Sequence, residues 1–98
     1  GNYLGHDKDM YKGLADSMKY AVYCHLKVHK IEKNGKTADF DLDKVFKVLR
    51  AADYRGWIAL EYEGQEFIKG EKQEKAENES EFFRVAVKKA KEMARKYY

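Results

Sequence analysis

Two short apolar runs constrain the fold of this sequence more than any other feature. The first covers residues 21–27 and the second covers residues 57–64, and helix-like segments lie before, between and after them. Both runs are rich in β-branched or aromatic residues, which is typical of buried strands of a parallel sheet. Each run carries a polar residue near its C-terminal end. The sequence therefore predicts two parallel strands that bring His25 and Glu61 to one rim of a sheet.

Alternation assigns the side chains of each strand to two faces. In the strand predicted at 21–28, one side carries Ala21, Tyr23, His25 and Lys27, and the other carries Val22, Cys24 and Leu26. In the strand predicted at 57–63, one side carries Trp57, Ala59 and Glu61, and the other carries Ile58, Leu60 and Tyr62. We expect the more apolar sides to pack under helices, where Cys24 would be inert.

Helical spacing of apolar residues predicts three helices, over 8–20, 42–53 and 80–97. Asp7 is expected to cap the first helix, Asp41 or Asp43 begins the second, and Asn78 with Glu81 has capping-box spacing before the third. The expected buried stripes are Met10, Leu14, Ala15 and Met18; Leu42, Val45, Phe46, Leu49 and Ala52; and Phe82, Ala86, Ala90, Met93 and Tyr97, with Phe83 and Val87 beside the third stripe.

The connecting segments are polar and rich in turn signals. Residues 1–6 are expected to form a loop, and residues 64–79 form a long charged connection that contains Phe67 and Ile68. In the polar loop at 29–41, Asn34 and Gly35 are a strong turn signal, and Ile31 can join a small hairpin flap there.

Composition narrows the function classes. The 98 residues carry 20 basic and 17 acidic side chains, so no concentrated basic face for nucleic acid is expected. One cysteine excludes an internal disulfide and fits the cytoplasm. No apolar run is long enough to span a membrane. The sequence begins with Gly1 rather than methionine, which suggests a processed, tagged or truncated N-terminus.

Two stretches resemble a known family. Residues 20–27 look like the seventh strand of the xylose-isomerase-like barrels, with the pattern Y-V-x-H-x-H-L-K-D, and residues 43–64 are similar to the following helix and strand, which end in G-W-x-x-x-E-Y-E-G. Gly1 and Asn2 fit the end of the family's D-x-G-N. The resemblance implies that residues 1–98 are one partial domain, the C-terminal βα units of a TIM barrel. The family comprises sugar and sugar-phosphate isomerases and epimerases, with inosose dehydratases and AP endonucleases as relatives.

The resemblance also implies roles for four residues. His25 and Glu61 match ligands of a divalent metal (Mn, Co, Zn or Mg), and Glu61 also matches the acid/base that moves a proton beside the substrate carbonyl. Asn2 and Lys27 match positions that contact the sugar or sugar phosphate. The family's other two ligands, an Asp and a Glu, would precede Gly1.

The sequence departs from the family pattern at three positions. Tyr23 stands where a histidine is common, Val28 where an acid is common, and Asp53 where a glycine usually ends the helix.

Each candidate site residue also has a purely structural interpretation. Glu61 can be a rim carboxylate paired with Lys27, Glu63 is expected to be solvent-facing or structural, and His6 and His29 are expected to be exposed loop residues. Two strands cannot close a barrel of eight, so we expect either an N-terminal part that completes the barrel or self-assembly into oligomers.

Three functions therefore remain open. The first is part of a metal-dependent isomerase or epimerase, inactive alone; the second is a non-catalytic self-assembling module. The third, an AP endonuclease relative, is disfavoured by the charge balance and by the three histidines, too few for a multi-metal cluster.

Overall fold

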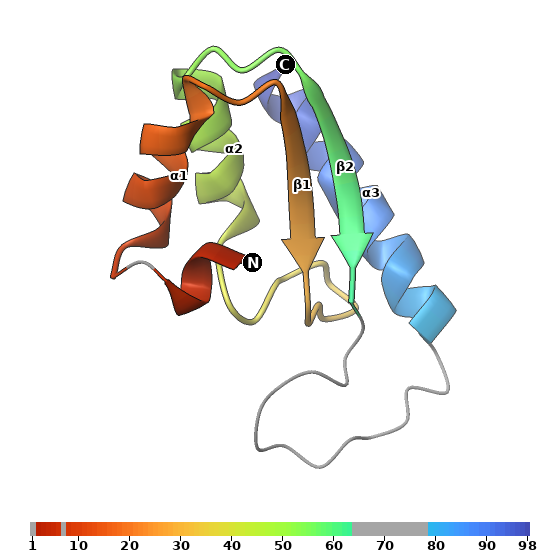
Figure 1. Cartoon of the computed structure of the whole chain (residues 1–98). Coiled ribbons are helices and arrows are strands. Elements are labelled where there is room, and N and C mark those ends of the chain that lie inside the picture. The colour runs from red at the N-terminus through yellow and green to blue at the C-terminus, as the bar shows by residue number, and fades with distance from the viewer. Residues whose placement is uncertain (1, 7, 64–78) are drawn as a thin grey trace.

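The computed structural model describes residues 2–6, 8–63 and 79–98 (Figure 1). The elements, in chain order, are η1 (Asn2–Gly5), α1 (Met10–Met18), β1 (Tyr23–Val28), α2 (Leu42–Ala51), β2 (Trp57–Tyr62) and α3 (Glu79–Tyr97). The predicted order of three helices and two strands is confirmed. No helix in the described part of the chain is both long and apolar enough to cross a membrane.

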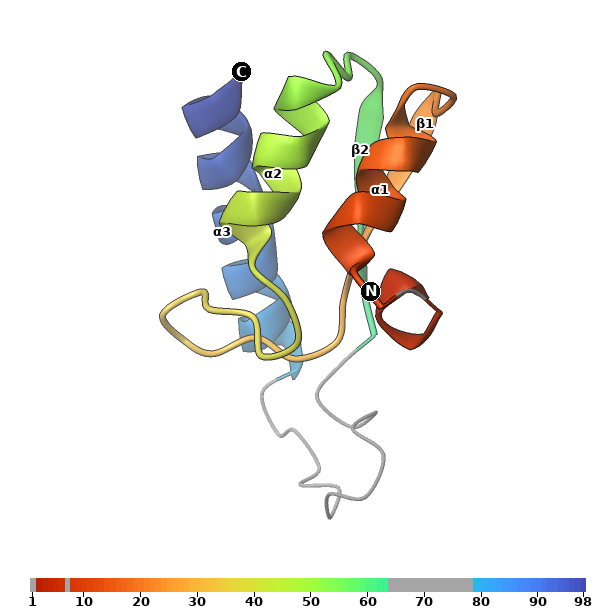
Figure 2. The same cartoon turned by 90° about the vertical axis from the view of Figure 1, so that its left-hand side faces the viewer.

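β1 and β2 form a parallel two-stranded sheet, as predicted. Their register runs from Tyr23 opposite Trp57 to Val28 opposite Tyr62. α2 and α3 lie on one side of this sheet, and in Figure 2 α1 lies in front of the strands, on the side of β1. The structure is therefore a two-layer α/β arrangement, and none of the residues that it describes forms a layer over the second sheet face, which we term the uncovered face. The exposure of Tyr23 (53%) and Trp57 (80%) on that face agrees with this arrangement.

The core lies between the sheet and the helices. Leu26 and Val28 of β1 and Phe46 and Leu49 of α2 are buried, and Ile58 and Leu60 of β2 pack against them. Burial of these apolar side chains supplies the main driving force for folding. The predicted alternation is confirmed within both strands.

One valine and two alanines that were expected in the core are exposed. Val22 is 86% exposed because β1 begins only at Tyr23. Ala15 and Ala52 are exposed because the buried stripes of α1 and α2 are narrower than predicted, and Ala52 lies beyond the last residue of α2. Phe83, expected beside the stripe of α3, is also exposed.

Aspartates begin the first two α-helices. The carboxylate of Asp9 accepts hydrogen bonds from the backbone N–H groups of Tyr11 and Lys12, so Asp9 caps α1 instead of Asp7, which lies outside the described residues. Asp41 caps α2 in the same way. These caps satisfy N–H groups that have no partner within the helix.

Asp53 follows the end of α2 with a φ of +52°. This left-handed conformation is the one that glycine usually provides after a helix. Asp53 therefore adopts this conformation at the cost of a strained backbone.

The segment between β1 and α2 is polar in sequence, but three of its side chains are buried. Ile31 and Thr37 form an antiparallel bridge, and Gly35 takes a φ of +85° in the turn, which confirms the hairpin flap. Ile31, Thr37 and Phe40 are buried, so this loop closes one end of the core. The charged connection and the capping role predicted for Asn78 lie outside the described residues.

The first residues of the chain form the short helix η1 where a loop was expected. The hydroxyl of Tyr3 donates a hydrogen bond of 2.8 Å to the Ser17 hydroxyl and thereby ties η1 to α1. This contact, which spans 14 positions in sequence, is not visible in local patterns.

Candidate active site

The uncovered sheet face holds the residues predicted to carry the chemistry. Lys27 lies directly opposite Glu61 in the parallel register, and His25 lies opposite Ala59, one step before Glu61 on the same face. His25 Nδ1 is 3.5 Å from Glu61 Oε2, and Lys27 Nζ is 3.7 Å from Glu61 Oε1. The side chains of His25 and Glu61 therefore project toward a shared point, which confirms this part of the prediction.

Two further residues extend this arrangement. Lys27 Nζ is 2.5 Å from Glu63 Oε1, and His29 Nδ1 is 3.2 Å from Glu63 Oε2. His25, Glu61, Lys27, Glu63 and His29 thus form a continuous row of alternating basic and acidic groups, which we term the rim cluster.

Glu63 has a structural role at the rim, as the sequence suggested. The pKa of Lys27 is raised, chiefly by its hydrogen bond to Glu63, and the pKa of Glu63 is lowered, chiefly by the same bond. Both shifts favour the charged forms, so the pair is ionised near neutral pH. Lys27, with 16% of its side chain exposed, is held between two carboxylates.

His29 is placed differently from the expectation of an exposed loop residue. Its side chain is only 22% exposed, and its buried Nδ1 atom lies 3.2 Å from Glu63 Oε2 but outside hydrogen-bond geometry with any residue that the structure describes. The alternation that places 25 and 27 on one side continues to 29, and that of 59 and 61 continues to 63. This continuation past the strand ends is the signal that would have added His29 and Glu63.

Asn2 belongs to the same region but not to the rim cluster. It is exposed on η1 and lines a groove of about 290 Å³ together with His25 and Lys27 of β1. Glu61 does not line this groove. The structure thus brings His25, Lys27 and Glu61 into contact and places Asn2 along a groove that two of them share.

Cys24 faces the helical side of the sheet. It is partly buried, and burial raises the pKa of its thiol, which lowers its reactivity. This location supports the expectation of an inert residue.

The rim cluster fits part of a metal site. An imidazole nitrogen and a carboxylate are donors that Mn, Co, Zn and Mg accept. Catalytic sites normally use three protein ligands, and the described residues contain no group of three or more His, Cys, Asp or Glu side chains that could hold an ion. His25 and Glu61 can therefore supply two ligands, with the Lys27 ammonium as a competitor for Glu61.

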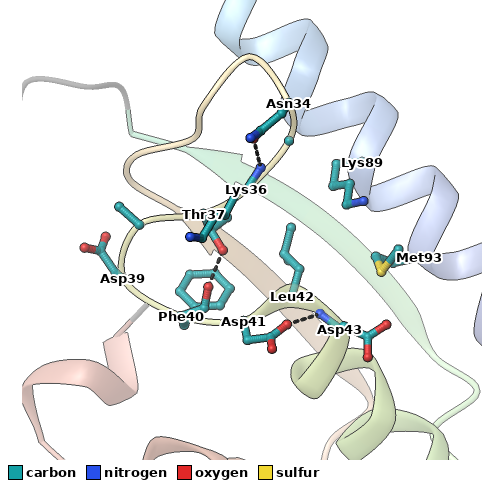
Figure 3. Close-up of a pocket in the computed structure, with 12 residues that line it drawn as sticks. Asn34, Lys36, Thr37, Asp39, Phe40, Asp41, Leu42, Asp43, Lys89 and Met93 are labelled. Carbon is teal, nitrogen blue, oxygen red and sulfur yellow. Dashed lines mark hydrogen bonds between the residues drawn. The ribbon is translucent and has the colours of Figure 1, made fainter.

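A larger pocket, of about 620 Å³, lies between residues 34–43 and Lys89 and Met93 of α3 (Figure 3). Three of its polar side chains make hydrogen bonds within the loop or at its junction with α2. Asn34 accepts a hydrogen bond from the Lys36 N–H, the Thr37 hydroxyl donates to the Phe40 carbonyl, and Asp41 caps α2. These bonds shape the loop, and we assign the pocket a structural origin.

Comparison with known proteins returns no match for the chain, either among protein-family models or among curated proteins. A proposal for the function therefore depends on the geometry of the rim cluster.

Proposed function

We propose that this chain provides the last two βα units of a xylose-isomerase-like barrel, a divalent-metal-dependent sugar or sugar-phosphate isomerase or epimerase. The observation that carries the proposal is the 3.5 Å approach of His25, in the middle of β1, to Glu61, near the carboxyl end of the parallel strand β2. Ligands of α/β enzymes bind at this end of the sheet. The cytoplasm is the compartment we assign to such an enzyme.

Glu61 carries the chemistry in this proposal. A carboxylate within hydrogen-bond reach of a carbon-bound proton next to a carbonyl can remove that proton and return it to a neighbouring atom. A divalent ion held in part by His25 and Glu61 would supply Lewis-acid stabilisation of the oxygen on which charge develops.

Lys27 and Asn2 bind the substrate in this proposal. The ammonium of Lys27 lies 3.7 Å from Glu61 and can donate a hydrogen bond to a hydroxyl or a phosphate close to the reacting carbon. Its pairing with Glu63 holds it in that position. Asn2, along the adjoining groove, adds an amide that both donates and accepts.

Two strands alone do not form a complete barrel. Within residues 2–6, 8–63 and 79–98, no element forms an opposing wall for the side chains of the uncovered face, and two ligands bind an ion weakly. We therefore expect the isolated chain to bind metal weakly and to be catalytically inactive, with the remaining strands supplied by an N-terminal part of the barrel.

Binding of Mn²⁺ tests the proposal directly. In NMR titrations with Mn²⁺, we expect paramagnetic broadening to centre on the amides of residues 25 and 61. His25→Ala and Glu61→Gln should each reduce this local broadening several-fold. His6→Ala removes an exposed histidine outside the rim cluster and serves as the matched control.

Two results would contradict the proposal. Broadening spread evenly over the acidic surface would show that no site exists at the rim. Broadening at the rim that both His25→Ala and Glu61→Gln leave unchanged would show that these side chains are not the ligands.

A second candidate function is a non-catalytic self-assembling module. Trp57 and Tyr23 lie opposite each other on the uncovered face, 80% and 53% exposed. Large exposed aromatic side chains that adjoin one another are typical of association surfaces. In light scattering, Trp57→Ser should lower the mass of such an assembly, whereas Tyr98→Ser, at the end of the chain, should not. A monomeric wild type would exclude this function.

A further inference from the structure

Glu63 is the more firmly held of the two carboxylates in the rim cluster, although it lies just past the end of β2. Its N–H donates a hydrogen bond of 3.0 Å to the carbonyl of Val28, which fixes its backbone against β1. Its Oε1 atom is 2.5 Å from Lys27 Nζ, and its Oε2 atom is 3.2 Å from His29 Nδ1. The backbone and both carboxylate oxygens of Glu63 are therefore engaged.

Glu61 is held more loosely. Its oxygens are 3.5 Å from His25 Nδ1 and 3.7 Å from Lys27 Nζ, and its side chain is 41% exposed against 31% for Glu63. Both distances exceed the range of about 2.7–3.2 Å that N–H···O hydrogen bonds prefer. The carboxylate of Glu61 is thus left with weak contacts, as a ligand awaiting an ion requires.

Lys27 controls how much of Glu61 stays available. Lys27 lies directly opposite Glu61 in the strand register, yet its ammonium is much closer to Glu63. With 16% of the side chain exposed, this ammonium has little access to water, so Glu61 is its nearest alternative acceptor if Glu63 is lost. An ammonium hydrogen-bonded to Glu61 competes with a cation for the same oxygens.

We propose that Glu63 is a positioning residue that keeps Lys27 away from Glu61 and thereby preserves Glu61 as a ligand for a divalent cation. The inference rests on the proposed function, because it concerns the same two ligands, and it adds a role for a residue that does not touch the ion. Glu63 acts through Lys27, so a chain without Lys27 no longer depends on it.

Zn²⁺ titrations of wild type, Glu63→Gln, Lys27→Met and the double variant test the proposal. Zn²⁺ binds nitrogen and oxygen ligands more tightly than Mn²⁺, which suits a weak site. The readout is the affinity at the rim, taken from the NMR shifts of the amides of residues 25 and 61 in about 0.15 M salt, which screens distant charges. Glu63→Gln should weaken binding about three-fold, since an ion pair of partly exposed groups is worth about that factor. Lys27→Met should bind at least as tightly as wild type, and in its background most of the loss caused by Glu63→Gln should be absent.

A control variant and a metal-free measurement separate positioning from a general effect. Glu92→Gln removes the same charge from an ion pair on α3, where Glu92 Oε2 is 3.4 Å from Lys89 Nζ, and should leave the rim affinity unchanged. In the metal-free chain, Glu63→Gln should strengthen the nuclear Overhauser contact between the Lys27 Hε and Glu61 Hγ protons. A merely structural role for Glu63 would leave this contact unchanged and would weaken binding with or without Lys27.

Three results decide the matter. If Glu63→Gln weakens binding equally in the presence and absence of Lys27, Glu63 does not act through Lys27 and the inference is overturned. If Glu63→Gln binds like wild type while His25→Ala abolishes binding at the rim, the inference is overturned and the proposed function stands. If wild type shows no Zn²⁺-induced shift at residues 25 and 61, the proposed function fails, and the inference fails with it.

Discussion

Gly56 determines how closely the start of β1 and the start of β2 can approach. A Cβ atom at this position would lie 2.6 Å from the backbone oxygen of Val22 and 2.5 Å from the hydroxyl of Tyr54. Tyr54 is buried, and its hydroxyl donates a hydrogen bond of 2.7 Å to the Trp57 carbonyl. Neither neighbour can retreat by the several tenths of an ångström required without moving a strand.

Gly56→Ala is therefore expected to destabilise the protein. Forcing an extra carbon into a packed site costs about 1–3 kcal/mol. The lower entropy of the unfolded chain with alanine returns about 0.4–1 kcal/mol. The net loss is about 1–2 kcal/mol, which corresponds to a melting temperature lower by about 5–15 °C for a domain of this size.

Urea denaturation followed by circular dichroism measures this loss. Gly5→Ala is the matched control, because a Cβ there meets no atom within 4 Å, and its unfolding free energy should be equal to or above that of wild type. In a Tyr54→Phe background, which lacks one of the two obstructing oxygens, Gly56→Ala should cost less. A Gly56→Ala protein as stable as wild type would refute the argument that the strand starts cannot separate.

Two further predictions concern the core and the acid sensitivity of the fold. Leu49→Ala truncates a side chain with 0% exposure and should lower the unfolding free energy by about 2–5 kcal/mol in urea denaturation; a change below 1 kcal/mol would contradict the packing described. Asp43 lies 2.5 Å from Lys96 Nζ and 2.9 Å from Lys47 Nζ, and its pKa is lowered, first by Lys96. A lowered folded-state pKa stabilises the fold above the ordinary carboxyl pKa and loses that contribution as the solution is acidified. Stability should therefore fall below about pH 4, and less in Asp43→Asn than in Asp39→Asn, an exposed control.

The sequence predicts the elements well because their signals are local. Hydrophobic periodicity identifies both strands and the three longer helices, and parallel pairing follows from the helix between the strands. The ends of elements are less predictable. Asp7 and Asp9 are equivalent N-cap residues by type, and only the position of the first helical turn selects Asp9.

Part of the candidate site was also predictable from local sequence signals. His25, Lys27 and Glu61 lie within recognisable strands, so alternation alone places them on one face. His29 and Glu63 follow the strand ends, where alternation is no longer assured, and their contact depends on how the chain leaves the sheet. The burial of Ile31 and Thr37 likewise depends on the hairpin that covers the core, which composition alone does not reveal.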